Sequence, residues 1–165
     1  MKSVKVAWVF LAVLVVVFPL ALRAQTQPAA PAADVIPETE IRALIDKYID
    51  RYKAMDLDAF MAVFSKGAVE NRMLPYADIK AFYKKTFDMT NQFLYHLDVK
   101  GIQSYTNSAF VSGRYEIIQT LKEGNEMVIH NGNIQWDLVK EEGSLKIRRI
   151  NFGRDIKEKK FWKNL

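Results

Sequence analysis

The sequence predicts an α+β domain in which helices pack on one face of a curved antiparallel sheet. Two observations support this class. Apolar residues recur at helical spacing in the first half of the domain, and long β-rich segments separated by short turns make up the second half. Helices and strands that are segregated along the chain in this way are typical of α+β folds.

The N-terminal residues 1–24 have the pattern of a targeting segment. Lys2 and Lys5 precede an uncharged apolar run over residues 6–22, and small residues suit a signal-peptide cleavage site after Ala24. The run is also long enough that an uncleaved N-terminal membrane anchor remains the alternative. In both cases we expect the domain that follows to be extracytoplasmic, either periplasmic or secreted.

The remaining chain divides into a linker, one domain and a tail. Residues 25–36 are rich in Pro and Ala and are predicted to be a linker. Residues 37–154 have the length of a single domain, and residues 155–165 form a lysine-rich basic tail. The net charge of +5 arises mainly from the targeting segment and this tail, so we expect no binding to nucleic acid.

Three helices are predicted in the first half of the domain. Pro37 suits the first turn of the first helix, and Asp56 suits the N-cap of a short second helix, which Gly67 is expected to end. A short strand over residues 68–73 and a third helix over residues 77–88 should follow. The first helix has the clearest apolar periodicity, at Ile41, Leu44, Ile45, Tyr48, Ile49 and Tyr52.

Four long strands are predicted after the helices. They are expected over residues 93–105, 109–121, 127–139 and 145–152. Because short turns join them, successive strands should be antiparallel neighbours. Gly101 is expected at a bulge or bend, and a change in the parity of the apolar positions predicts a second bulge at the paired arginines Arg148 and Arg149.

This order of elements resembles the nuclear transport factor 2-like (NTF2-like) superfamily, including its SnoaL-like and ketosteroid-isomerase-like branches. Besides the first helix, the resemblance rests on MDLDAFMAVFS at residues 55–65, AVEN at 68–71, DIKAFY at 78–83 and the hairpin WDLVKEEGSLKIRRINF at 136–152. It implies a cone, in which a bent sheet wraps around three N-terminal helices and leaves a pocket at the wide end. Because the superfamily contains isomerases, cyclases, dehydratases and adaptors, the resemblance does not imply one reaction.

The resemblance also implies positions for a site. Tyr48 occupies the place of the tyrosine that, in ketosteroid isomerases, donates a hydrogen bond to the developing oxyanion. Asn71 occupies the place of their aspartate base, although a one-residue gap would bring Glu70 there instead. Gln135 falls where they carry a protonated acid. Since Asn has no carboxylate and Gln is not an acid, the sequence predicts no catalytic residue of this type.

The pocket candidates are therefore Tyr48, Tyr52, Asn71, Gln135 and Arg148. Both tyrosines lie on the apolar face of the first helix, where they also suit a core position. The resemblance turns Gln135 inward, whereas the alternation of its strand places it on the face opposite the core. Arg148 suits an acidic ligand or a partner carboxylate, or else a solvated edge.

No cofactor and no metal site are expected. The two histidines, His96 and His130, lie in different strands without the ligand spacing of a zinc or iron site, and the absence of cysteine excludes thiolate ligands and disulfides. The sequence also lacks a nucleophile motif and a Gly-rich phosphate loop.

We interpret the chain as an exported NTF2-like domain that acts as a non-catalytic module for binding a small ligand or a protein. The alternative is a SnoaL-like or ketosteroid-isomerase-like enzyme that acts on an apolar, carbonyl-bearing small molecule. Apolar residues on both faces of the long strands predict a homodimer through the sheet. An apolar small molecule or a protein is the expected partner, and a membrane is expected to bind only the N-terminal segment, if it is uncleaved.

Overall fold

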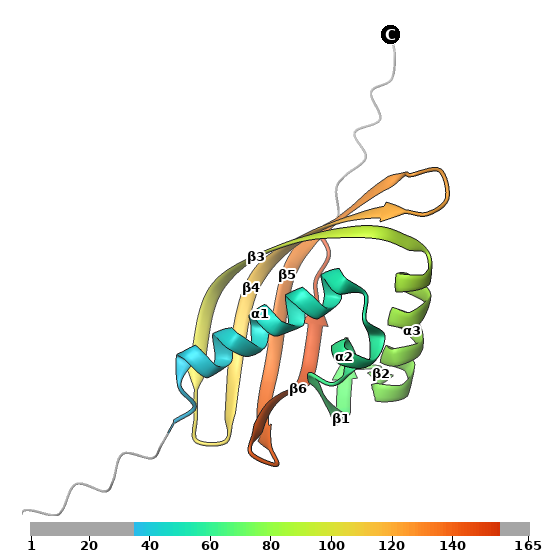
Figure 1. The fold of residues 1–165 in the computed structure, drawn as a ribbon. Coiled ribbons are helices and arrows are strands. Elements are labelled where there is room, and N and C mark those ends of the chain that lie inside the picture. Colours follow the sequence, from blue (N-terminus) through green and yellow to red (C-terminus); the bar gives the residue numbers. More distant parts are fainter. Residues whose placement is uncertain (1–34, 156–165) are drawn as a thin grey trace, which may run out of the picture. The chain divides into compact units, whose positions relative to one another are not determined.

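A computed structural model describes residues 35–155 of the chain (Figure 1). The predicted targeting segment, most of the linker and most of the tail lie outside the described residues. The helices are α1 (Glu38–Ala54), α2 (Leu57–Met61) and α3 (Tyr76–Asp88). The strands are β1 (Phe64–Glu70), β2 (Leu74–Pro75), β3 (Thr90–Ser104), β4 (Ser108–Leu121), β5 (Met127–Glu141) and β6 (Ser144–Phe152).

The start of α2 and the end of α1 have the local chemistry expected of helix ends. The Asp56 side chain accepts a hydrogen bond from the backbone N–H of Ala59 at 3.0 Å and so caps α2, as expected. Met55 ends α1 in the left-handed conformation with φ of 56°. The expected role of Gly67 as a helix end is wrong, because α2 ends at Met61 and Gly67 lies within β1.

The six strands form one curved sheet in the order β2-β1-β6-β5-β4-β3 (Figure 1). The meander from β3 to β6 is antiparallel, as predicted. The sheet as a whole is mixed rather than purely antiparallel, because β1 runs parallel to β6. No short turn joins these two strands, so the rule that makes hairpin neighbours antiparallel does not apply to them.

The register of the sheet shifts at both positions where the sequence predicted a bulge. The register of β5 against β6 shifts between Asp137 and Leu138, which leaves Arg148 as the extra residue. The register of β3 against β4 shifts between Val99 and Gly101. Both positions agree with the sequence, and bulges of this kind increase local twist and bending.

The concave face of the sheet packs against α1 and carries the hydrophobic core. Tyr48, Phe60 and Trp136 are buried side chains at its centre, with ring centroids 5.2 Å and 6.0 Å from that of Tyr48. The core begins at Ile36, whose N–H donates to the carbonyl of Tyr105 at 3.0 Å. Within residues 35–155, no helix is long and apolar enough to span a membrane.

Candidate functional site

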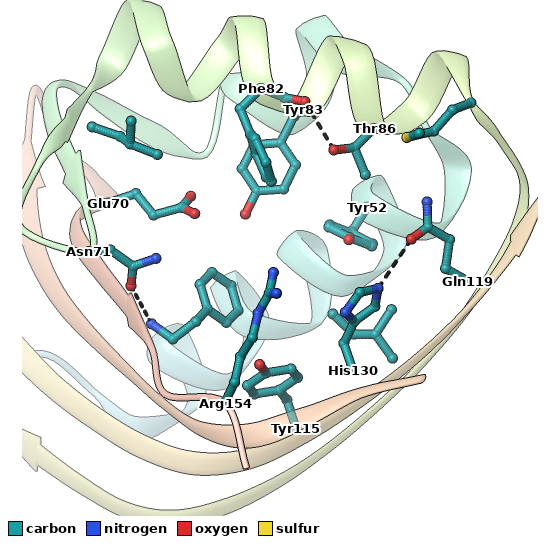
Figure 2. Close-up of a pocket in the computed structure, with 14 residues that line it drawn as sticks. Tyr52, Glu70, Asn71, Phe82, Tyr83, Thr86, Tyr115, Gln119, His130 and Arg154 are labelled. Carbon is teal, nitrogen blue, oxygen red and sulfur yellow. Dashed lines mark hydrogen bonds between the residues drawn. The ribbon is translucent and has the colours of Figure 1, made fainter. Parts of the chain in front are cut away.

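A cavity of about 490 Å³ lies between α3, the end of β1 and the inner face of β4 and β5 (Figure 2). Its walls combine aromatic and aliphatic side chains with a few polar groups, which is the usual composition of a small-molecule site. The lining residues are Tyr52, Glu70, Asn71, Leu74, Phe82, Tyr83, Thr86, Met89, Tyr115, Ile117, Gln119, His130, Phe152 and Arg154.

Glu70 is the buried acid of this cavity. It is the last residue of β1, it points to the same side of the strand as the core residue Ala68, and only 4% of it is exposed. One of its carboxyl oxygens has no hydrogen-bond partner among the described residues. Burial raises the pKa of Glu70 from 4.5 to about 7, and the nearby hydroxyl of Tyr83 offsets part of this effect.

Asn71 fixes the end of β1 against β6. Its side-chain Oδ1 accepts a hydrogen bond from the N–H of Phe152 at 2.7 Å, and its own N–H donates to the carbonyl of Ile150 at 2.9 Å. Asn71 has φ of 49°, a left-handed conformation that Asn tolerates better than most residues. It lines the cavity, and its hydrogen bonds hold the strand end that carries Glu70.

His130 reaches the cavity from β5 and is held by a relay of hydrogen bonds. The Thr90 hydroxyl donates to the carbonyl of Thr86 at 2.6 Å, so its oxygen accepts from Nε2 of Gln119 at 2.7 Å. Oε1 of Gln119, 3.2 Å from His130 Nε2, must then accept the proton of that nitrogen. The relay therefore leaves Nδ1 of His130 as an unprotonated acceptor on the cavity side (Figure 2).

The charge state of His130 agrees with this arrangement. Burial lowers the pKa of His130 below its ordinary value of 6.5, and the positive charge of Arg154 lowers it further. His130 is therefore neutral at pH 7. Among the described residues, no group of three or more His, Cys, Asp and Glu side chains could hold a metal ion.

The structure brings two of the five sequence-derived pocket candidates, Tyr52 and Asn71, to this cavity. Tyr48 lies behind the wall, with none of its surface exposed, and its hydroxyl has no hydrogen-bond partner among the described residues. Burial raises the pKa of Tyr48 well above its usual value, so this hydroxyl stays protonated.

The other two candidates lie outside the main cavity. Gln135 faces the outer side of the sheet, as strand alternation predicted and the resemblance did not, where it lines a separate polar cleft of about 410 Å³. Arg148 donates to the hydroxyl of Ser65 at 3.2 Å and lies 3.7 Å from the carboxylate of Glu141. The bulge therefore directs Arg148 towards side chains of its own domain and not into the cavity.

Sequence reasoning did not place Gln119, His130 and Arg154 in the site. A signal existed for His130, because it has the same parity as the core residues Ile134 and Trp136 on its strand. No comparable signal existed for Arg154, which follows the last predicted strand.

Solved structures resemble the domain over most of their length. An NTF2-like superfamily protein from Salmonella enterica serovar Typhimurium matches with a TM-score of 0.64 and 15% identity, over 78% of this chain and 96% of that chain. A ketosteroid isomerase-like protein from Erwinia carotovora atroseptica matches with a TM-score of 0.60 and 20% identity, over 73% of this chain and 96% of that chain. The protein Aln2 from a Streptomyces species matches with a TM-score of 0.61 and 19% identity, over 73% of this chain and 93% of that chain.

The domain therefore has an NTF2-like, SnoaL-like fold, which confirms the family resemblance in the sequence at the level of fold. No protein-family model matches the chain, and a comparison with curated proteins gives no match. Because the fold hosts many activities, the function has to be argued from the cavity.

Proposed function

We propose that the chain binds an apolar small molecule in this cavity and transfers a proton on it, with Glu70 as the acid–base group. The observation that carries the proposal is the buried carboxyl of Glu70, which has an oxygen without a partner among residues 35–155 and faces a largely apolar cavity. A structural carboxylate of the core would be expected to have its oxygens paired.

The pKa of Glu70 suits this role. At a value of about 7 the carboxyl takes up and releases a proton near neutral pH, where general acid–base catalysis is most effective. Nδ1 of neutral His130 provides an acceptor for a hydroxyl or amide proton of the same ligand. In its ionised form Glu70 would accept a proton from the carbon next to a carbonyl group of the ligand, which leaves Glu70 neutral and the ligand as its enolate, and would then return the proton to that enolate. His130 would orient a ligand that also carries a hydroxyl or amide group.

Exchange of carbon-bound hydrogen tests the proposal. With 2-tetralone, an apolar ketone, in D2O, we expect the protein to accelerate loss of the α-proton signals in NMR spectra. Glu70→Gln should reduce this acceleration by about 10²-fold or more, the usual contribution of a positioned base. Glu116→Gln, at an exposed position on β4, is the matched control and should leave the rate unchanged. Failure of 2-tetralone to bind would contradict the proposal.

A non-catalytic ligand-binding module is the second candidate function. It is favoured by the positions of Tyr48, which is enclosed behind the cavity wall, and Gln135, which faces the outer cleft. Neither residue can donate a hydrogen bond to a ligand in the cavity, so two of the roles implied by the resemblance are missing. Binding of 2-tetralone without accelerated exchange would support this candidate.

We also propose that the domain is extracytoplasmic, because a basic start and an apolar run precede it. N-terminal sequencing of the protein from fractionated cells is expected to find Gln25 as the first residue, in the periplasmic or secreted fraction. Intact chain in the membrane fraction would indicate the uncleaved anchor. Cytoplasmic protein that begins at Met1 would contradict export.

A homodimer through the outer face of the sheet is proposed as well. Leu94, Ile118 and Ile129 are opposite one another on β3, β4 and β5, and Leu94 and Ile129 are 55% and 52% exposed. An exposed apolar row of this kind favours association. Light scattering on residues 25–165 is expected to give twice the chain mass, and Ile129→Lys should give a monomer. A wild-type monomer at tens of micromolar would contradict the dimer.

A further inference from the structure

We infer that the cavity selects ligands that carry a carboxylate group, and that the guanidinium of Arg154 binds this group. The inference rests on the proposed function, since it assumes that an apolar small molecule occupies the cavity. It goes further in naming the chemical class of the ligand, an apolar organic acid, and the residue that recognises it.

The backbone directs Arg154 towards the cavity. After Phe152, which lies opposite Ile134, the chain continues along β5 with two hydrogen bonds. The N–H of Gly153 donates to the carbonyl of Asn133 at 2.8 Å, and the N–H of Asp155 donates to the carbonyl of Asn131 at 3.0 Å. Because side chains alternate along such a segment, Arg154 has the same orientation as Phe152 and lines the cavity with it.

Asp155 holds the segment from the other side of the sheet. Its carboxylate pairs with the guanidinium of Arg114, which also donates to the side chain of Asn133 at 3.2 Å on the outer face of β4 and β5. Arg154 is therefore flanked by two residues whose backbones are bound to β5, and one of them is also fixed by an ion pair. We assign Arg114 and Asp155 as positioning residues for Arg154.

Gly132 on β5 allows the backbone of residues 153–155 to lie close to this strand. A Cβ at this position would lie 1.7 Å from the carbonyl oxygen of Gly153 and 3.0 Å from Cα of Arg154. Any larger residue would force the segment away from β5. The absence of a side chain here therefore permits the close approach that brings Arg154 to the cavity.

The guanidinium of Arg154 has hydrogen-bond donors available for a ligand. It lies near Tyr115 and His130 (Figure 2). Its positive charge contributes to the lowered pKa of His130, and it offsets part of the rise that burial causes in the pKa of Tyr115. Among residues 35–155, no carboxylate forms an ion pair with Arg154. Arg154 is an exposed residue, and the planar fork of its guanidinium matches the two oxygens of a carboxylate.

Two probes of the same shape test the inference, namely 2-naphthaleneacetate and 2-naphthaleneacetamide. Their affinities are measured by isothermal titration calorimetry at pH 6, where Glu70 is mostly protonated and does not repel an anion. Wild-type protein is expected to bind the acid at least tenfold more tightly than the amide. Arg154→Gln should abolish this preference while retaining the affinity for the amide.

Two further variants distinguish the positioning of Arg154 by Arg114 from the effect of the protein's overall positive charge on an anionic ligand. Arg114→Gln should reduce the preference for the acid, because the segment that carries Arg154 loses its ion pair. Arg51→Gln removes the same charge from the exposed last turn of α1 and should leave the preference intact. Equal affinity of wild-type protein for both probes, or a preference that survives Arg154→Gln, would overturn the inference and leave the proposed function standing. Binding of neither probe would count against both.

Discussion

Replacing Glu70 with glutamine is expected to stabilise the protein at pH 8 by up to about 3 kcal/mol, while it removes proton transfer. The pKa of Glu70 is raised from 4.5 to about 7 by burial. Between these pH values the folded protein keeps a proton that the unfolded chain has released, so the free energy of unfolding falls as the pH rises. The full penalty of the buried charge applies above pH 7, and glutamine avoids it.

Urea denaturation at several pH values checks this prediction. Wild-type and Glu70→Gln proteins should differ most at pH 8, and the difference should shrink towards pH 4.5. Glu116→Gln serves as the control, because it makes the same chemical change at an exposed position on β4. Equal stability of wild type and Glu70→Gln at pH 8 would show that Glu70 is not held in an unfavourable charged state.

Replacing Gly132 with alanine is expected to destabilise the domain and to abolish the preference for an acidic ligand. The added Cβ would meet backbone atoms of Gly153, which can give way only if the backbone of residues 153–155 moves away from β5. Overpacking of this kind costs about 1–3 kcal/mol. Since displacement of residues 153–155 relieves the clash, Arg154 should leave the cavity in the variant.

Gly101→Ala is the matched control for this substitution. Its Cβ would have only the hydroxyl of Ser112 close by, at 3.3 Å, on the bulge of β3. We expect Gly101→Ala to change the free energy of unfolding much less and to retain the preference for 2-naphthaleneacetate. If Gly132→Ala retained that preference with unchanged stability, the close approach of residues 153–155 to β5 would be refuted.

Local patterns in the sequence predicted the parts of the fold that depend on local interactions. Helical spacing of apolar residues identified α1 and α3, because one face of each packs on the core. Parity along the strands predicted the bulge at Arg148, because an extra residue reverses the alternation. The parallel pairing of β1 with β6 had no local signal, since their partner residues are far apart in sequence.

The site was harder to predict than the fold for the same reason. Glu70 remained an alternative to Asn71 because the resemblance leaves a one-residue gap in the alignment near these positions. Only the structure shows that Glu70, paired with Ile150, is the buried acid of the cavity and that Asn71 lines the cavity beside it. Arg154 depends on hydrogen bonds that continue β6 beyond its last ladder pair. Its neighbours in sequence, Gly153 and Asp155, resemble the start of a solvated tail.

The parallel contact of β1 with β6 also bears on the order of folding. Asn71 and Phe152 are 81 positions apart, whereas the hairpins of the meander join neighbours in sequence. Closing such a long loop has a high entropic cost, so contacts of this kind tend to form late. The acid and the arginine of the cavity come from opposite ends of that loop. We therefore expect the cavity to form late in folding, and a chain that ends before β6 to lack it, because Phe152 and Arg154 line the cavity beside Glu70.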